Sequence, residues 1–213
     1  MRDPSKFWDK MARTYSHMPV ADEDSYQKKL QVTQQYLRPD MEVLEFGCGT
    51  GSTAIVHAPH VKHIRAIDIS TRMIEIARAK ADANNITNIK FLMADINAFS
   101  VPDQTLDAVL GLSILHLVDD KEAVMSKVHK MLKPGGIFVT STTCLADGTS
   151  FLKKFAPIGT VLGLMPPLKI FTEKELQNSM TETGFRIDHL WQPGKGKAVF
   201  IVAKKADYNW LPR

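Results

Sequence analysis

The stretch VLEFGCGTGS, residues 43–52, places three glycines at alternate positions directly after a short apolar run. The run predicts a buried strand, and the glycines predict a turn whose main chain can take positive φ angles and approach a ligand closely. A dinucleotide-binding GxGxxG loop would need glycine or alanine at Ser52, and a phosphate-binding loop would need Gly-Lys-Ser/Thr. Neither is present, and the carboxylate of Glu45 would repel a pyrophosphate. The stretch therefore predicts a loop for a ligand without phosphates, with a tight turn that binds nothing as the alternative.

Outside this loop the apolar pattern changes repeatedly between strand and helix periodicity, which is typical of a wound α/β sheet. The predicted strands cover residues 42–46, 63–68, 89–93, 106–110, 137–141 (after a turn at 133–136), 185–191 and 198–203. The predicted helices cover residues 3–16, 24–37, 52–57, 70–84, 120–132 and 172–183. The fold class is therefore α/β, a Rossmann-like, mostly parallel sheet of seven strands with an antiparallel last strand, helices on both faces and an N-terminal helical appendage.

Charge and cysteine content narrow the function classes. The formal net charge is +4, but Lys and Arg are scattered and do not cluster with aromatic residues, which argues against nucleic acid as a partner. The two cysteines, Cys48 and Cys144, fit neither a disulfide framework nor a zinc-ligand spacing, so we expect a cytoplasmic location and no metal site. The longest uncharged stretch, residues 157–168, is too short to cross a bilayer, so we expect no transmembrane segment.

Acidic residues end three successive predicted strands. Asp68 closes the second strand, where a carboxylate can accept hydrogen bonds from both hydroxyls of a ribose. Asp95 follows the third strand and could accept a hydrogen bond from an exocyclic adenine amine. Each aspartate alone is as readily a solvated turn residue or a helix cap. With Glu45 they form a series at the carboxyl ends of the strands, where open α/β sheets bind ligands.

Together these residues resemble the class I S-adenosylmethionine-dependent methyltransferases. VLEFGCGTG is similar to the first motif of that family, Asp68 stands at its second-strand acidic position, and Asp95-Ile96 stands at its adenine site. The segments DAVL and KPGG resemble its fourth and fifth strands. The resemblance covers residues 40–203, and the small, tail-extended form is similar to a type-11-like branch that includes the quinone-biosynthesis methyltransferases. It implies an enzyme that transfers a methyl group from S-adenosylmethionine.

The resemblance also implies roles for the residues around the glycine loop. The amides near Gly47 and Gly49, beside Glu45, would hold the methionine end of the cofactor, and Asp68 would hold its ribose. Ser113, on the segment after the fourth strand, would lie near the methionine portion or the reacting methyl group.

The adenine would be held by a second group of residues. Ile69 and Met73 would border its face, and Asp95 with Ile96 would fix its edge. Met73 alone would more often be a core residue than a ligand contact.

Two tyrosines and one histidine complete the candidate site. Tyr15 could reach the cofactor carboxylate, with Tyr26 as the alternative, and packing is an equal interpretation for both. A sulfonium methyl is already activated, so transfer is an in-line displacement that needs mainly alignment and exclusion of water. His116, in the segment after the fourth strand, could still act as a general base, against a binding or structural role.

The segment GLSI after the fourth strand differs from the Asp/Asn-Pro-Pro-aromatic pattern of methyltransferases that act on base amines. We therefore expect a small-molecule acceptor, apolar or aromatic, methylated at O, N or C. A single methyltransferase domain is expected, divided into a helical N-terminal cap (1–40), a cofactor-binding core (41–144), a lid insertion (145–171) and a C-terminal helix and hairpin (172–205). The apolar lid could enclose substrate or simply cover the sheet.

Two other function classes remain open at this point. An NAD-dependent oxidoreductase would share the fold, but Glu45, Ser52 and the lack of a Tyr-x-x-x-Lys motif argue against it. A noncatalytic S-adenosylmethionine-binding module would keep the cofactor residues without turnover. The substrate, the acceptor atom and the oligomeric state do not follow from the sequence.

Overall fold

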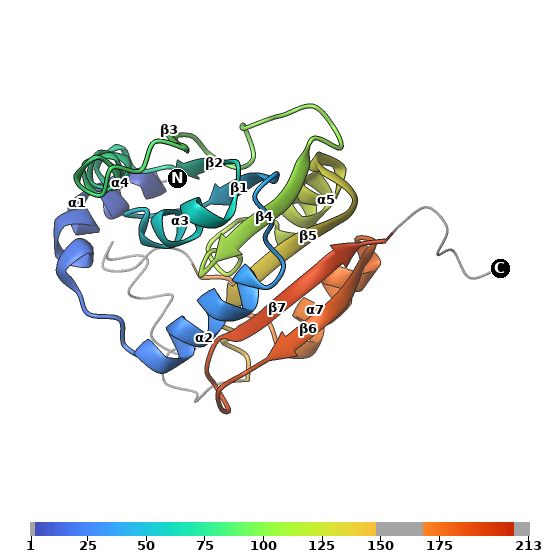
Figure 1. Cartoon of the computed structure of the whole chain (residues 1–213). Coiled ribbons are helices and arrows are strands. Elements are labelled where there is room, and N and C mark those ends of the chain that lie inside the picture. The colour runs from blue at the N-terminus through green and yellow to red at the C-terminus, as the bar shows by residue number, and fades with distance from the viewer. Residues whose placement is uncertain (1–2, 148–167, 207–213) are drawn as a thin grey trace. The chain divides into compact units, whose positions relative to one another are not determined.

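The computed structural model describes residues 3–147 and 168–206 (Figure 1). The chain divides into two compact units, Met1–Ser100 and Val101–Arg213, and each is described by itself. The strand order of the seven-stranded sheet is β3-β2-β1-β4-β5-β7-β6, the first three strands from the first unit and the last four from the second. The predicted α/β fold with a seven-stranded sheet is therefore confirmed.

The first unit is built on three parallel strands. These are β1 (Glu42–Phe46), β2 (His63–Asp68) and β3 (Ile89–Met93), with bounds identical to those predicted. The helices of this unit are α1 (Pro4–His17), α2 (Glu23–Gln34), α3 (Ser52–His57), the 3-10 turn η1 (Ala58–His60) and α4 (Thr71–Ala83). Asp68 pairs in register with Met93, so the carboxyl ends of β2 and β3 lie together.

Local capping explains where the helices of the first unit begin. The carboxylate of Asp3 accepts a hydrogen bond from the amide of Ser5 at the start of α1, where Pro4 occupies the first turn. Ser70 does the same for α4 by accepting from the amide of Met73, as its N-cap position predicts. Helices α1 and α4 pack against each other.

The second unit holds the mixed part of the sheet. Its elements are β4 (Leu106–Leu112), α5 (Lys121–Met131), β5 (Leu132–Thr142), α7 (Glu173–Glu182), β6 (Phe185–Trp191) and β7 (Val199–Lys205). Strand β4 is parallel to β5, whereas β7 is antiparallel to both of its neighbours, β5 and β6. The predicted antiparallel last strand and the predicted capping box at Thr172 and Glu175 are both confirmed.

Strand β5 starts earlier than predicted. The sequence places a turn at residues 133–136 before the strand, but the strand begins at Leu132 and includes these residues. The register between β4 and β5 shifts at this point, where Leu106 pairs with Leu132 and Ala108 pairs with Ile137. Three extra residues thus form a bulge in β5. The local sequence pattern is the same for such a bulge and for a turn, so the sequence alone does not distinguish them.

Two further predictions concern parts of the chain that the structure describes only in part. Most of the predicted lid, residues 148–167, lies outside the described residues. Within the ranges that the structure describes, no helix combines the length and apolar character needed to cross a membrane.

Candidate functional site

The glycine loop has the backbone conformation that its sequence predicts. Gly47, Gly49 and Gly51 have φ angles of 65°, 52° and 74°. A Cβ atom on Gly51 would lie 2.8 Å from Cβ of Ala77 and 2.8 Å from the ring of Phe91, so this glycine is required by packing as well as by its φ angle. A Cβ atom on Gly49 would have no neighbour closer than 3.8 Å. The loop is therefore tightly packed at its last glycine and open at its middle one.

Asp68 connects this loop to the end of β2. Its Oδ2 accepts a hydrogen bond of 2.9 Å from the amide of Gly49, and its Oδ1 accepts one of 2.9 Å from the amide of Ser70. Burial raises the pKa of the Asp68 carboxyl, and the hydrogen bonds from these two amides act in the opposite direction. An ionised carboxylate accepts about four hydrogen bonds, so Asp68 retains capacity for the hydroxyls of a ribose.

Glu45 is the most deeply buried carboxyl group of the first unit. Only 3% of the residue is exposed, and its Oε2 accepts no hydrogen bond from any residue that the structure describes. Burial, with a smaller contribution from the charge of Asp68, raises the pKa of Glu45 to about 8. Glu45 is therefore mainly protonated at neutral pH. A buried polar atom with no partner is uncommon in folded proteins and is often explained by function.

A cavity of about 250 Å³ lies at the carboxyl ends of β2 and β3. Its lining brings together two residues predicted to contact adenine, Ile69 and Asp95. It adds Met93 and the first turn of α1, which were not predicted. The complete lining is Asp3, Pro4, Ser5, Ile69, Met93 and Asp95. Met93 ends β3 and is 60% exposed, and no pattern in the sequence marked it as a site residue.

The other two predicted adenine contacts do not line this cavity. Met73 is 2% exposed and belongs to the core of the first unit, which agrees with the packing interpretation of this residue. Ile96 is also buried, at 5% exposed. A contact of either side chain with adenine remains a prediction.

The two candidate tyrosines occupy different places in the first unit. Tyr15 approaches the glycine loop, since its Cε1 lies 3.8 Å from the position of a Cβ on Gly49. Its side chain is 47% exposed. The hydroxyl of Tyr26 lies 3.4 Å from Oγ1 of Thr53 and so connects α2 to α3. Tyr15 is thus the better placed of the two to meet a ligand at the loop.

Ser113 and His116 belong to the second unit, in the segment that follows β4. Ser113 is exposed, has a φ angle of 57° and donates a 2.7 Å hydrogen bond from its amide to the carbonyl of Ser141. Nδ1 of His116 is buried and has no hydrogen-bond partner within the described chain. Burial lowers the pKa of His116, so its imidazole is neutral at neutral pH and can accept a proton.

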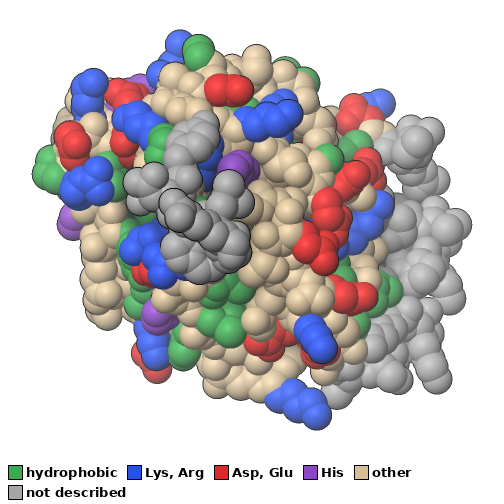
Figure 2. Space-filling view, turned by 90° about the vertical axis from the view of Figure 1, so that its right-hand side faces the viewer, with side chains coloured by type: hydrophobic (Ala, Val, Ile, Leu, Met, Phe, Trp, Pro, Cys, Tyr) green, Lys and Arg blue, Asp and Glu red, His purple; other side chains and the backbone are tan. Residues whose placement is uncertain are grey.

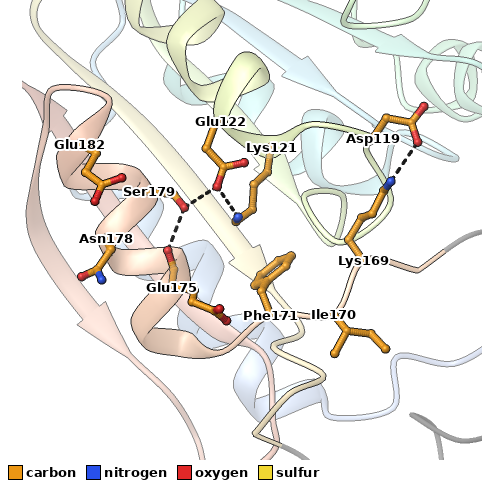
Figure 3. Close-up of a pocket in the computed structure, with 10 residues that line it drawn as sticks. All are labelled: Asp119, Lys121, Glu122, Lys169, Ile170, Phe171, Glu175, Asn178, Ser179 and Glu182. Carbon is orange, nitrogen blue, oxygen red and sulfur yellow. Dashed lines mark hydrogen bonds and ion pairs between the residues drawn. The ribbon is translucent and has the colours of Figure 1, made fainter.

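A second cavity, of about 460 Å³, lies in the second unit between α5, α7 and the segment before α7 (Figure 3). Its charged groups mostly pair with each other: Lys169 lies 3.2 Å from Asp119, and Lys121 pairs with Glu122. Lys121 also lies 4.9 Å from the centre of the Phe171 ring. None of the residues predicted for the candidate site lines this cavity.

Comparisons with known proteins identify the chain's relatives. The O-methyltransferase of Pyrenophora dematioidea is 30% identical over 152 residues, which are 70% of this chain and 55% of that protein. The phosphoethanolamine N-methyltransferase of Triticum aestivum is 31% identical over 113 residues, 53% of this chain and 22% of that protein. The chain thus spans about half or less of the length of these curated relatives.

A solved structure shares the fold. Geranyl diphosphate C-methyltransferase from Streptomyces coelicolor A3(2), crystallised with Mg²⁺, geranyl diphosphate and S-adenosyl-L-homocysteine, superposes with a TM-score of 0.71 at 16% identity. The likeness covers 86% of this chain and 79% of that protein. The sequence model of one family, described as "Methyltransferase domain", matches residues 37–210. With the glycine loop and the acidic strand ends in place, this match shows that the chain belongs to the methyltransferase domain family.

Proposed function

We propose that this protein transfers the methyl group of S-adenosylmethionine to a small-molecule acceptor by in-line displacement. One observation carries the proposal: Asp68 joins the open glycine loop to the strand end beside the 250 Å³ cavity. A ribose held at Asp68 would have the cavity on one side for its base and the glycine loop on the other for its amino-acid end. The match to the methyltransferase domain family supports this arrangement.

Three features of the first unit fit this cofactor. The middle of the glycine loop is open at Gly49, the cavity has the apolar side chains of Ile69 and Met93 for a flat base, and Glu45 has a buried oxygen without a partner. Asp95 at the cavity offers a carboxylate to an adenine amine. When bound, S-adenosylmethionine supplies a methyl group that its sulfonium charge has already activated.

The protein's own residues would then bind and orient the cofactor and accept a proton from the acceptor. Backbone amides near Gly47 and Gly49 would bind the methionine end, while the Gly49 amide itself donates to Asp68, and Asp68 would bind the ribose. His116, neutral because burial lowers its pKa, would take a proton from an acceptor hydroxyl or amine. Ser113, three residues before His116 in the same segment, would orient the methionine portion or the acceptor.

The acceptor is proposed to be a small molecule, apolar or aromatic. The names of the relatives describe methyl transfer to oxygen in one case and to nitrogen in another, so both atoms are candidates here. Figure 2 shows a band of acidic side chains on one face, with the described Lys and Arg side chains dispersed around it, and such a face does not favour nucleic acid. A cytoplasmic location, from the two free cysteines, belongs to the same proposal.

The test is calorimetric titration of the purified protein with S-adenosylmethionine, S-adenosylhomocysteine and NAD. Asp68→Ala should weaken the binding of both sulfur ligands by more than tenfold, because the ribose hydroxyls and the Gly49 amide lose a charged acceptor. Asp40→Ala is the matched control, since Asp40 is exposed and pairs only with Arg38 among the described contacts. Unchanged affinity in Asp68→Ala would remove Asp68 from the site.

Turnover separates the enzyme from a binding module. Incubation with S-adenosylmethionine and a panel of phenols, amines and quinols should yield a methylated product and S-adenosylhomocysteine, measured by mass spectrometry. Binding without any product would favour the noncatalytic module. Tighter binding of NAD than of S-adenosylmethionine would instead favour the oxidoreductase.

A further inference from the structure

Helix α1 touches the candidate cofactor site of the first unit at three points along its length. Its first turn, Asp3 to Ser5, lines the cavity with Ile69, Met93 and Asp95. Near its middle, Asp9 contacts the start of α4. Near its end, Tyr15 approaches Gly49 of the glycine loop. The three points correspond to the carboxyl ends of β3, β2 and β1, in that order.

The dimensions agree with a helix laid across these strand ends. From Pro4 to Tyr15 an α-helix rises about 16 Å, and three adjacent strands span about 10 Å. Ligands of open α/β sheets bind at this edge, so α1 lies over the place where the proposed cofactor would bind. A ligand that reaches from the cavity to the glycine loop would therefore lie beneath α1.

Asp9 makes the contact that fastens the middle of the helix. Its Oδ1 accepts a 2.6 Å hydrogen bond from Oγ of Ser70 and a 3.1 Å hydrogen bond from the amide of Arg72. Both donors belong to the start of α4, where a negative charge is favourable to the helix. The amide of Ser70 donates in turn to Asp68, which accepts from Gly49. A continuous chain of hydrogen bonds thus links α1 to the glycine loop.

The rest of α1 is held less firmly. Ala12 is its only buried residue in the described chain. Its aromatic side chains Trp8 and Tyr15 contact each other edge to face, and Tyr15 is about half exposed. A helix with so little buried apolar surface belongs to the part of a fold that opens most readily. The two hydrogen bonds of Asp9 are charge-assisted and therefore stronger than neutral ones.

We propose that Asp9 is a positioning residue that fastens α1 over bound S-adenosylmethionine, so that the cofactor enters and leaves only when α1 detaches from Ser70 and Arg72. The inference rests on the proposed function, because it concerns the same site. Burial is the main cause of the raised pKa of Asp68, and the negative charge of Asp9 adds to it, which agrees with a position of Asp9 beside the proposed ribose site.

The experiment compares Asp9→Ala, Asp9→Asn and the control Lys10→Ala, which changes an exposed neighbour on the same helix. The dissociation rate of S-adenosylhomocysteine is measured by stopped flow, and amide hydrogen exchange is measured across α1. Asp9→Ala should release the ligand at least tenfold faster and should lose the protection of α1, while β1 and β2 stay protected. Asp9→Asn should release the ligand at a rate between those of wild type and Asp9→Ala, because the asparagine oxygen can accept the same two hydrogen bonds but carries no charge.

The outcomes separate this inference from the proposed function. Unchanged ligand release and unchanged α1 exchange in Asp9→Ala would overturn the inference, as would equal losses in Asp9→Ala and Asp9→Asn. A second measurement needs only the wild type: S-adenosylhomocysteine should slow exchange throughout α1, and no slowing there would also overturn the inference. Absence of ligand binding to the wild type would instead count against the proposed function, while exchange of α1 in free Asp9→Ala would still test the Asp9 contact.

Discussion

At the scale of single residues, two carboxyl groups at the end of the first unit's strands differ in their surroundings. Asp68 accepts hydrogen bonds from two backbone amides, which favour its charged form. Glu45 is buried with no partner for Oε2 among the described residues, which favours its neutral form. Burial raises the pKa of both carboxyls, and at Asp68 the two backbone amides act against that shift. Asp68 therefore offers a hydrogen-bond acceptor at the proposed ribose position, whereas Glu45 is mainly protonated at the base of the glycine loop.

Glu45→Gln should stabilise the protein at higher pH. The pKa of Glu45 rises from 4.5 in the unfolded chain to about 8 in the folded protein, so its contribution to stability is fully present below pH 4.5 and is lost as the pH rises toward 8. Glutamine cannot ionise and escapes that loss. Urea denaturation should give similar free energies of unfolding for both proteins near pH 4.5, and the variant should exceed wild type by a few kcal/mol near pH 8, since one pKa unit corresponds to about 1.4 kcal/mol.

Glu182→Gln, at an exposed position on α7, is the control and should leave the pH profile unchanged. Parallel pH profiles for wild type and Glu45→Gln would show that Glu45 ionises normally in the folded protein.

At the scale of the elements, the glycine loop joins β1 to α3 under strict packing limits. Helix α3 begins directly after Gly51, whose α-carbon faces Ala77 of α4 and Phe91 of β3. The closing glycine of the loop therefore sets how closely α4 and β3 approach the loop, whereas the middle glycine leaves room for a ligand.

Gly51→Ala should destabilise the protein by about 3 kcal/mol. The added methyl group would lie 2.8 Å from Ala77 and Phe91, and alanine at a φ of 74° is strained. Thermal and urea denaturation would measure the loss. Gly194→Ala is the control, because a Cβ there meets nothing within 4 Å, and it should change the free energy of unfolding by less than about 1 kcal/mol. Equal stability of the two variants would contradict the packing argument.

Most elements were predictable because their boundaries carry local signals. The bounds of β1, β2, β3 and β6 agree with the predicted ones, and the N-caps Ser70 and Thr172 begin α4 and α7 as expected. The predicted start of β5 was wrong because β5 pairs with β4 through a bulge. This pairing is a nonlocal contact, and it overrides the local turn pattern at residues 133–136. Helix α2 ends at Gln34, three residues before the prediction, since Pro39 marks a limit and not the exact end.

At the scale of the whole molecule, the chain divides into two compact units whose strands follow one another in a single sheet order. The predicted single domain therefore remains a proposal that unfolding can test. The described helices and strands extend over both units, and the family match spans residues 37–210.

Thermal unfolding of the whole protein should show one transition that S-adenosylhomocysteine shifts upward. A ligand at 100 times its dissociation constant stabilises the folded state by about 2.7 kcal/mol, which for a chain of this size raises the midpoint by roughly 5 to 10 °C. NAD at the same concentration should produce no shift. Two separate transitions by calorimetry, with only one moved by the ligand, would contradict a single domain and assign the ligand to one unit.

By itself, the sequence determined the class of fold and the chemistry of the strand ends. Both depend on local patterns: the period of the apolar residues, the alternate glycines, and an acidic residue near the end of each of three strands, namely Glu45, Asp68 and Asp95. The resemblance of these motifs to a methyltransferase is confirmed at the level of the family, whereas the similarity to the quinone-biosynthesis branch stays a prediction.

Only the tertiary structure decided which side chains meet. The first turn of α1 and Met93 line the cavity, Asp9 bonds to Ser70, and Met73 turns into the core, although no short pattern in the sequence distinguishes these outcomes. The sequence likewise does not show that Oε2 of Glu45 is buried without a hydrogen-bond partner among the described residues. The physical reason is that burial and hydrogen-bond partners arise between segments distant in the chain, so they are properties of the packed fold and not of local sequence.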